Sequence, residues 1–272
     1  MTTFECELCD YENPKDTASA IIITDQKLFV AKRNIKADPF FGKWDFIGGF
    51  IQKGETPEEG LKREIKEELG IESELDYIGI FPGTYPDKRR EVPINNFAFL
   101  TKLTGKIKIN KKEHSALNWV PLKDIKTIAF DSNQKILDFV KQNFTYDLKR
   151  VHELVSQLDP SAKVDEQALY KASLNGYVSK VYDKNKLIGM GWIFPRQTLL
   201  RRQAVVEDMI VDENYRGKGL GRKILLDLIK WAKDQGVEVV ELTTNPKRVA
   251  ANELYKSVGF TLHPTNHYLL KL

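Results

Sequence analysis

Residues 49–71 read GFIQKGETPEEGLKREIKEELGI, a glycine-containing loop that leads into a short helical pattern. Thr56 is placed to cap the helix, Pro57 suits its first position, and Glu59 completes a capping box with Thr56. Gly70 is placed to end the helix in the left-handed conformation. The pattern therefore predicts a helix from Thr56 to Leu69.

Three carboxylates of this helix, Glu64, Glu67 and Glu68, are spaced at i, i+3 and i+4 and share one face. Such a cluster repels itself, so it is either a solvated acidic surface or a site for a cation. Mg²⁺ prefers oxygen ligands and is commonly held by a few carboxylates together with substrate phosphates. The helix alone leaves both interpretations open.

The loop before the helix favours the cation site, because the whole segment resembles the Nudix box. That pattern is G-x5-E-x7-R-E-U-x-E-E-x-G-U, where U is aliphatic. Its fixed positions are all matched, by Gly49, Glu55, Arg63, Glu64, Ile65, Glu67, Glu68, Gly70 and Ile71. A departure lies at Ile47, where the family often has proline before two glycines, but it removes no ligand.

The resemblance implies a Nudix hydrolase fold, which is an α/β/α sandwich around a mixed sheet. It implies hydrolysis of a nucleoside diphosphate linked to another group X, with Mg²⁺ or Mn²⁺ as cofactor. The residues that it assigns are Glu64, Glu67 and Glu68 as metal ligands, Glu67 and Arg63 as catalytic residues, and Gly48 and Gly49 as the backbone that approaches the diphosphate. Arg63 would brace the carboxylates through an ion pair.

Further candidates follow the box. Glu113 precedes Trp119 by six residues in KEHSALNWVPL, and in several Nudix proteins a glutamate at similar spacing reaches the metals or acts as base. A solvated loop glutamate is the alternative. Tyr85 could stack on a base, and Pro86 is placed rather as in ADP-ribose pyrophosphatases, so an ADP-ribose-like substrate is one expectation.

Cys6-x-x-Cys9 resembles half of the zinc ribbon that precedes some Nudix domains. A structural zinc site needs four ligands, and the four histidines of the chain are remote from the cysteines in sequence. The favoured interpretation is a degenerate ribbon over residues 1–14 that binds no zinc. Zinc shared across a dimer, or completed by a distant histidine, is the alternative.

A second motif lies in residues 205–222, VVEDMIVDENYRGKGLGR, where a predicted strand leads through a glycine-rich turn into a helix. Successive backbone N–H groups and the helix dipole make such a turn a site for pyrophosphate. The spacing differs from G-x-G-x-x-G, which argues against a dinucleotide fingerprint.

This turn resembles the motif [RQ]-x-x-G-x-[GA] of GNAT acetyltransferases, here at Arg216, Gly219 and Gly221. The later stretch NPKRVAANELYKSVGF resembles another motif of the same family. The resemblance covers about residues 147–272 and implies a central, mostly antiparallel, splayed sheet flanked by helices. It also implies acetyl-coenzyme A as cosubstrate and an acceptor amine that the sequence does not identify.

The site residues implied by this resemblance fall into three groups. The pyrophosphate would bind the backbone of Arg216, Gly217, Lys218, Gly219, Leu220 and Gly221, the pantetheine arm would pair with Met209, Ile210 and Val211, and Asn252 would contact the cofactor. Tyr255 would protonate the thiolate, unless it is simply a core aromatic. Glu207 and Asp208 would point to opposite faces of a regular strand, so only one of them can face the site. Glu207 is the favoured general base, and a purely structural role is the alternative.

Alternating and helical patterns predict two α/β domains, 1–145 and 146–272. The predicted strands are 18–32 (two runs around a turn), 75–81, 95–103, 117–120, 177–183, 186–194, 204–211, 238–243 and 259–270, and the further helices are 132–144, 148–158, 219–235 and 248–257. No Gly/Pro/Ser-rich linker marks the boundary.

Hydrophobic residues make up 42% of the 272 residues, which excludes wholesale disorder. The formal charge of +4 gives no indication of nucleic-acid binding. It contains no apolar run of about 20 residues and begins without signal-peptide features, so no membrane association and a cytoplasmic location are expected. A homodimer is compatible with the sequence.

The two motif sets together predict a bifunctional enzyme that combines a hydrolase with an N-acetyltransferase. One alternative is a nucleotide-sensing Nudix module that regulates the fused acetyltransferase. The complete set of carboxylates in the box favours hydrolysis over sensing. A GNAT half that serves only as an interaction module is a further alternative, disfavoured by the intact glycine loop and Tyr255.

Overall fold

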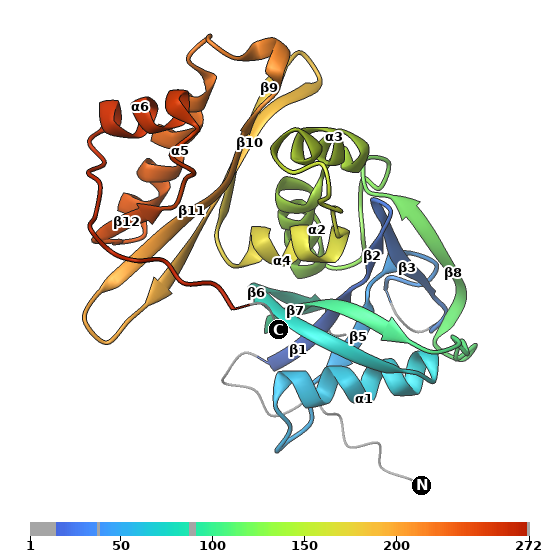
Figure 1. Cartoon of the computed structure of the whole chain (residues 1–272). Helices are drawn as coiled ribbons and strands as arrows, with labels where there is room; N and C mark the ends of the chain where they lie inside the picture. The colour runs from blue at the N-terminus through green and yellow to red at the C-terminus, as the bar shows by residue number, and fades with distance from the viewer. Residues whose placement is uncertain (1–14, 37–38, 87–90, 271–272) are drawn as a thin grey trace, which may run out of the picture. The chain divides into compact units, whose positions relative to one another are not determined.

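The computed structural model of the protein describes residues 15–36, 39–86 and 91–270 (Figure 1). The chain divides into two compact units, the first ending at Tyr146 and the second beginning at Asp147. Cys6, Cys9 and the ribbon expected over residues 1–14 lie outside the described residues. Among the described residues, no helix is long and apolar enough to span a membrane.

The described residues of the first unit form two sheets and two helices. Its elements are β1 (Lys15–Ile21), β2 (Ile23–Thr24), β3 (Lys27–Arg33), β4 (Trp44–Asp45), β5 (Ile47–Phe50), α1 (Pro57–Leu69), β6 (Glu72–Pro86), β7 (Glu91–Thr104), β8 (His114–Pro121) and α2 (Asp131–Phe144). One sheet has the order β5-β1-β7-β6, and the other joins β2, β3 and β4, with β8 paired to β3. Strand β1 is antiparallel to β5 and parallel to β7, so the first sheet is mixed.

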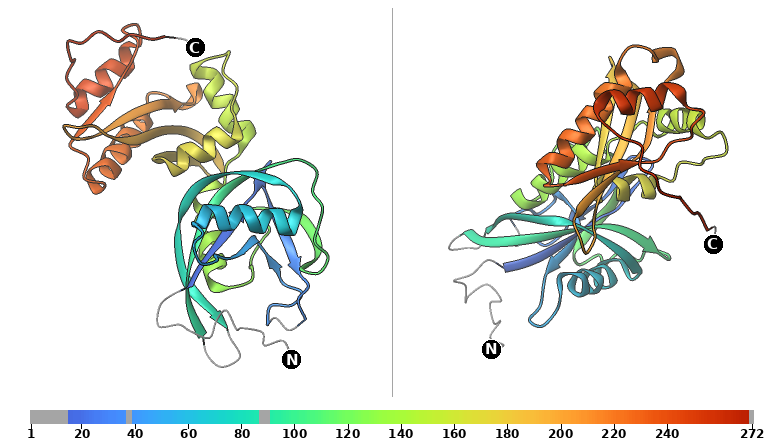
Figure 2. Two further views of the ribbon diagram at one scale, coloured as in Figure 1. Left: turned by 90° about the horizontal axis from the view of Figure 1, so that it is seen from below. Right: turned by 60° about the vertical axis from the view of Figure 1, so that its left-hand side comes forward.

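The two helices cover opposite faces of the mixed sheet. Alternate residues of β1 point to opposite faces, and their contacts show which helix lies on each face. Ala18 and Ala20 belong to the core cluster that contains Leu61 and Ile65 of α1. Ser19, between them, instead donates a hydrogen bond from Oγ to Asn133 Oδ1 of α2, at 3.1 Å. Figure 2 shows α1 lying across the strands of this unit. The predicted α/β/α sandwich is confirmed.

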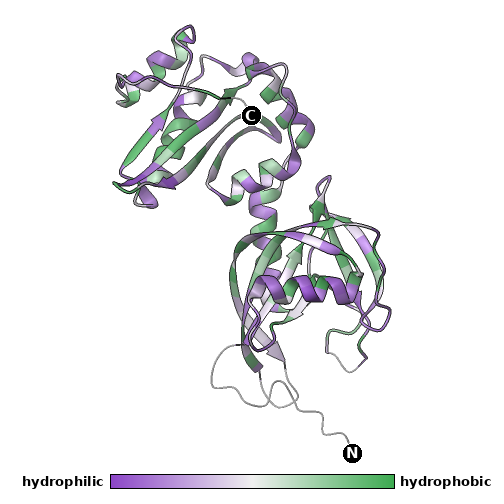
Figure 3. Cartoon of the chain, turned by 60° about the horizontal axis from the view of Figure 1, so that its bottom comes forward, coloured by the Kyte–Doolittle hydropathy of each residue, from purple (hydrophilic) through white to green (hydrophobic). Residues whose placement is uncertain are grey.

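Helix α1 begins and ends where the sequence predicted. The Thr56 hydroxyl accepts a hydrogen bond from the Glu59 N–H at 3.3 Å, and the Glu59 carboxylate accepts one from the Thr56 N–H at 2.8 Å. Gly70 ends the helix with φ 68° and donates from its N–H to the Lys66 carbonyl. In Figure 3 most of α1 is hydrophilic, in contrast to the greener strands beneath it.

The second unit is built on a single described sheet. Its elements are α3 (Leu148–Leu158), α4 (Glu166–Leu174), β9 (Tyr177–Asp183), β10 (Lys186–Gln197), β11 (Arg202–Val211), the short 3₁₀ helix η1 (Glu213–Tyr215), α5 (Leu220–Asp234), β12 (Val239–Leu242) and α6 (Val249–Val258). The strand order is β12-β11-β10-β9. Pairs β9–β10 and β10–β11 are antiparallel and β11–β12 is parallel, as expected of a mostly antiparallel sheet.

Helix α5 packs closely on this sheet because β10 presents glycines beneath it. Buried Ile224 and Leu228 of α5 share a core cluster with Val206 of β11. A Cβ added at Gly191 of β10 would lie 2.9 Å from Ile224 Cγ2, so a larger residue there would push the helix away. Glycine at this position therefore sets the distance between helix and sheet.

Strand β11 is irregular in its second half. Its register with β10 shifts between Met190 and Trp192, and Asp208 has φ 49°, which is a left-handed conformation. Its pairing with β12 covers only Gln203–Val206, although the strand continues to Val211. The end of β11 thus extends beyond β12, which ends at Leu242, and is not paired with it, as a splayed sheet requires.

The predicted strand at 259–270 is wrong, because the described residues after α6 form no strand. Pro264 has no N–H for a ladder, and Leu262, Tyr268, Leu269 and Leu270 are exposed. An alternating pattern supports a strand only where a neighbouring strand accepts its hydrogen bonds. Sequence reasoning also missed α4, β4 and β5.

Candidate functional site

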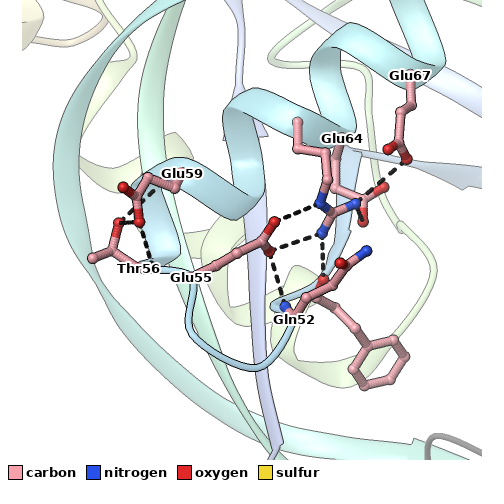
Figure 4. A network of polar contacts seen from close by, with 8 residues as sticks. Gln52, Glu55, Thr56, Glu59, Glu64 and Glu67 are labelled. Atoms are coloured by element: carbon pink, nitrogen blue, oxygen red, sulfur yellow. Dashed lines mark hydrogen bonds and ion pairs between the residues drawn. The ribbon is translucent and has the colours of Figure 1, made fainter.

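The guanidinium group of Arg63 joins α1 to the loop before it. Its Nε and Nη2 donate to the two Glu55 oxygens at 2.8 and 3.1 Å, and Nη2 also donates to the Phe50 carbonyl at 3.0 Å. Its Nη1 donates to Glu64 at 2.8 Å and to Glu67 at 3.4 Å. Figure 4 shows Glu55, Glu64 and Glu67 converging on this group. The brace expected between Arg63 and the carboxylates is thus present in the geometry.

The carboxylates of α1 differ in environment. Glu67 is 54% exposed in its side chain, whereas Glu68 is 3% exposed. Burial raises the pKa of Glu68 well above its ordinary value, and the negative charges of Glu64 and Glu113 add to the effect. Burial also raises the pKa of Glu64. The negative charges on this face of α1 are therefore incompletely balanced, and a bound cation would reduce the repulsion between the carboxylates.

The two glycines before α1 allow a close backbone approach. A Cβ added at Gly49 would lie 2.7 Å from the carboxyl carbon of Glu64. Gly48 has φ 145°, a Cβ there would lie 2.0 Å from the Ala18 carbonyl oxygen, and its N–H donates to Glu68 Oε1 at 3.3 Å. A larger residue at position 48 would collide with backbone, and one at position 49 would displace the Glu64 carboxylate, so the backbone itself forms one wall of the site.

Glu113 and His114 are brought beside Glu68 by the loop that precedes β8. The N–H of Lys108 donates to the Leu69 carbonyl at 2.7 Å, and that of Asn110 donates to the Glu68 carbonyl at 2.8 Å. Glu68, Glu113 and His114 each offer one ligand atom, all within 4.8 Å of one another. Oxygen donors predominate in the site, which suits a hard divalent cation.

His114 was not among the residues that the sequence analysis selected for this site. Its Nε2 is in hydrogen-bond contact with Glu68 Oε2, and burial lowers its pKa. The available signal was its position directly after Glu113 at the start of a predicted strand. That signal is weak, because it does not say which helix the side chain meets.

A cavity of about 750 Å³ opens beside the carboxylates and is lined by Glu64, Glu68 and Glu113 among others. Tyr85 and Phe130 form an aromatic part of its wall, with ring centroids 5.4 Å apart and planes inclined by 20°. Gly48 and Gly49 also line it, whereas Pro86 is not among the lining residues. The cavity thus joins a carboxylate end to an aromatic end.

A polar network forms another part of the cavity wall. Burial raises the pKa of Asp45 to about 6, although Arg33 pairs with it at 2.8 Å. Asn133 Nδ2 donates to Asp45 Oδ1 at 2.6 Å, and Asn133 Oδ1 accepts from Asn96 Nδ2 at 2.7 Å. Sequence reasoning missed this network, because its members come from β3, β4, β7 and α2 and share no local pattern.

In the second unit, the loop of residues 216–221 presents its backbone at the start of α5. Gly217 and Gly219 have φ 74° and 76°, and no heavy atom lies within 4 Å of a Cβ added to either. Gly219 is the N-cap of α5 and has no side chain to bond the first N–H groups, which begin at Leu220 and Gly221. This open helix N-terminus can bind an anion.

The side chains of this loop make only peripheral contacts. Arg216 Nε donates to the Val211 carbonyl at 3.1 Å, which ties the loop to the end of β11. Lys218 Nζ lies 4.9 Å from the centroid of the Tyr215 ring. At that end of β11, Ile210 is buried, while Met209 and Val211 are half-buried.

On α6, Tyr255 and Asn252 have different surroundings. Tyr255 is half-buried, its ring centroid is 6.1 Å from that of Phe260, and burial raises its pKa. It is therefore protonated near neutral pH, as a proton donor must be. Asn252 Nδ2 donates to the Asn245 and Arg248 carbonyls at 3.2 and 3.0 Å, so its amide closes the turn before the helix.

At Glu207 and Asp208 the backbone of β11 departs from the regular strand that the sequence predicted. A regular strand would point the two side chains to opposite faces, but the left-handed backbone at Asp208 interrupts this alternation. Burial raises the pKa of both carboxyl groups, and the charge of Asp208 further raises that of Glu207. The two groups therefore interact, and the expectation that only one of them faces the site no longer follows from the alternation of faces.

Comparison with known proteins finds two families on this chain. The NUDIX domain family matches residues 14–140, and the acetyltransferase (GNAT) family matches residues 142–260. An ADP-ribose pyrophosphatase of Methanocaldococcus jannaschii is 32% identical over 132 residues, which are 48% of this chain and 76% of that protein. An uncharacterised N-acetyltransferase of Bacillus subtilis is 32% identical over 92 residues, 34% of this chain and 36% of that protein.

Solved structures similar to the chain also fall into two groups. A MutT Nudix hydrolase from Burkholderia pseudomallei is 24% identical, with a TM-score of 0.40, and the match covers 47% of this chain and 98% of that one. An acetyltransferase from Trypanosoma brucei is 22% identical, with a TM-score of 0.39, and the match covers 46% of this chain and 93% of that one.

Proposed function

The chain belongs to the Nudix family in its first half and to the GNAT acetyltransferase family in its second, and on that premise we propose a bifunctional enzyme. Its first unit would hydrolyse a nucleoside diphosphate linked to a group X. Its second unit would transfer an acetyl group from acetyl-coenzyme A to an amine. The single observation that carries the first activity is the Arg63-braced carboxylate set beside the cavity.

For hydrolysis, Glu64, Glu67 and Glu68 are the proposed ligands of Mg²⁺ or Mn²⁺, and their oxygen donors fit either ion. A bound ion would neutralise phosphate oxygens and lower the pKa of water. Arg63 would hold Glu64 and Glu67 in place against their mutual repulsion. Glu113, close to Glu68, would accept the proton of the attacking water.

The cavity supports a nucleotide substrate. Gly48 and Gly49 would let the diphosphate approach the backbone next to the carboxylates, and Tyr85 would stack on the nucleoside together with Phe130. The name of the relative from M. jannaschii favours an ADP-ribose-like compound as the first candidate. Pro86 stays a prediction that rests on sequence position alone.

The test of hydrolysis is a screen of nucleoside diphosphate derivatives with Mg²⁺, in which phosphate-ester products are measured. The wild-type protein should cleave at least one compound, and Glu67→Gln should not. If no compound is cleaved but one binds in the cavity and changes acetyl transfer, the first unit is a nucleotide sensor and the proposal is wrong.

For acetyl transfer, the backbone of residues 216–221 would bind the pyrophosphate of coenzyme A, and Met209 to Val211 would pair with the pantetheine arm. The neutral amine would attack the thioester carbonyl through its nitrogen, and Glu207 would accept the proton that this nitrogen loses as the C–N bond forms. The C–S bond then breaks, and Tyr255 would protonate the leaving thiolate. Asn252 would contact the cofactor only if its amide left the turn that it closes.

The open N-terminus of α5 carries this second proposal. Calorimetric titration with acetyl-coenzyme A tests it directly, and a panel of primary amines would then identify the acceptor. Absence of any binding of acetyl-coenzyme A would favour an interaction module instead. The cytoplasmic location and the homodimer stay predictions.

A further inference from the structure

His114 is a buried imidazole at the start of β8. Its exposed fraction is 5%, whereas His152, His263 and His267 are all exposed. A polar ring taken out of water must be hydrogen-bonded to offset the cost of burial. The contact that it makes is therefore informative about its role.

The backbone aims this ring at the last turn of α1. The His114 N–H donates to the Asn110 carbonyl at 3.0 Å, while the Asn110 N–H donates to the Glu68 carbonyl at 2.8 Å. The loop is thereby attached to the helix at the residue whose side chain His114 contacts. Nε2 of the ring meets Glu68 Oε2.

The surroundings of the ring select one tautomer. Nδ1 is buried and has no hydrogen-bond partner among the described residues. A proton on Nδ1 would leave a buried donor unpaired and would turn the Nε2 lone pair toward a carboxylate oxygen. A proton on Nε2 makes the contact with Glu68 a hydrogen bond and leaves only a weak acceptor unpaired. The geometry thus favours Nε2–H.

Glu68 consequently accepts a hydrogen bond on each oxygen, from Gly48 N–H on Oε1 and from His114 on Oε2. Because the two donors meet different oxygens, they restrict the rotation of the carboxylate, and each oxygen keeps a further lone pair. We propose that His114 is the positioning residue of the metal site, holding Glu68 in the orientation that binds the ion. This inference rests on the proposed function, in which Glu68 is a metal ligand.

In this role the imidazole orients Glu68 and makes no bond to the metal itself. Outer partners that orient a ligand typically change metal affinity by about 10- to 100-fold when they are removed. Glutamine at position 114 can place an N–H donor near that of Nε2, whereas leucine fills the space without a donor. The pair His114→Gln and His114→Leu therefore separates hydrogen bonding from packing.

The first measurement is the dissociation constant of Mn²⁺ for the full chain, from the electron paramagnetic resonance signal of the free ion. We expect His114→Leu to weaken binding by about 10- to 100-fold and His114→Gln to stay within about threefold of wild type. Equal affinity in all three proteins overturns the positioning role. So does equal weakening in both variants at an unchanged melting temperature.

The second measurement uses only the wild-type protein, so it does not depend on whether a variant folds. Long-range ¹H–¹⁵N spectra of the metal-free wild-type protein should show His114 as the Nε2–H tautomer, and an Nδ1–H tautomer overturns the proposal. Pulsed resonance of bound Mn²⁺ should show no directly coordinated ¹⁴N, and a strong coupling would make the imidazole a ligand instead. If the wild-type protein binds no Mn²⁺, the proposed metal site is wrong. The spectra still test the hydrogen bond from His114 to Glu68, so the two failures can be distinguished.

Discussion

The two units build their candidate sites from different parts of the chain. In the first unit the chemistry lies in side chains, since Arg63, Glu64 and Glu68 carry charges that a single substitution removes. In the second unit the proposed cofactor site is mostly backbone, exposed by the left-handed Gly217 and Gly219. A side-chain site is sensitive to charge and a backbone site to conformation, so different substitutions should damage each.

A second contrast concerns two buried aspartates, each of which forms an ion pair with an arginine. Asp45 pairs with Arg33, and its pKa is raised to about 6 because burial outweighs the ion pair and the hydrogen bonds. Asp212 pairs with Arg150, and its pKa is lowered to about 2, because the hydrogen bonds of Arg150 and the Asn214 N–H outweigh burial. Similar pairs therefore act in opposite directions on stability at low pH.

The largest effect is expected from Glu68→Gln, which keeps the size of the side chain and removes its charge. Hydrolysis should fall by about 10³-fold, since metal-ion catalysis supplies several kcal/mol. Glu67→Gln should act in the same direction. Binding of acetyl-coenzyme A, measured by calorimetry, should stay unchanged in both variants.

Glu58→Gln is the matched control, because Glu58 lies on the same helix but is exposed and pairs with Lys62. Its hydrolysis rate should stay near that of wild type. Near-normal hydrolysis by Glu67→Gln and Glu68→Gln would exclude the proposed ligands.

The next effect is a pH dependence of stability. Because the pKa of Asp45 rises from 3.8 to about 6 on folding, the folded chain binds this proton more tightly than the unfolded chain. The resulting stability is present below about pH 4 and is lost as the pH rises to 6, an effect of about 3 kcal/mol at 1.36 kcal/mol per unit.

Calorimetric unfolding of wild type and Asp45→Asn at several pH values measures the contribution of Asp45 to the free energy of unfolding. Asparagine does not titrate, so the difference between the two proteins should change with pH. Asp212 contributes nothing that varies in this window, since its stabilisation is lost only as the pH falls from 3.8 toward 2. A constant difference between the two proteins from pH 4 to 6 would contradict the raised pKa.

Tyr255→Phe should lower the turnover of acetyl transfer by about 10²-fold, a typical contribution of general acid catalysis. The substitution removes one hydroxyl and keeps the ring that packs near Phe260. The dissociation constant of acetyl-coenzyme A should barely change. Full turnover in this variant would mean that water or another side chain protonates the thiolate.

Gly219→Val should weaken binding of acetyl-coenzyme A by about tenfold, because a β-branched residue strains the left-handed conformation by about 1–2 kcal/mol and obstructs the loop. Gly236→Val is the matched control, since Gly236 has φ 69° and equally open space but follows the other end of α5. Both variants should lose stability, and only Gly219→Val should lose affinity. Equal affinity of the two would show that the loop does not hold the cofactor.

The smallest effect is expected from separating the units. Fragments 1–146 and 147–272 should each fold, because each contains its own core cluster of strands and helices. Melting curves of the two fragments should match the transitions of the intact chain. If both fragments are unfolded while the intact chain melts cooperatively, the division between residues 146 and 147 is not an independent boundary.

Local features of the molecule were predictable from the sequence. Helix α1 follows from a capping box and a terminal glycine, and the face shared by Glu64, Glu67 and Glu68 follows from helical spacing. The left-handed glycines of the second motif likewise lie within a few residues of the helix that they precede. Each depends only on neighbours in the chain, so the pattern is complete within a short stretch.

Features assembled from distant segments were not predictable. Asp45, Asn96 and Asn133 meet across β4, β7 and α2, and His114 meets Glu68 because two backbone hydrogen bonds attach its loop to α1. Residues 259–270 show the converse, since their alternating pattern was sufficient for a prediction but no described strand pairs with them. The sequence by itself determined the two families and their motifs, because these depend on local spacing. Only the tertiary structure decided the cavity, the network and the partner of Glu68, because hydrogen bonds between distant residues depend on how the strands and helices pack.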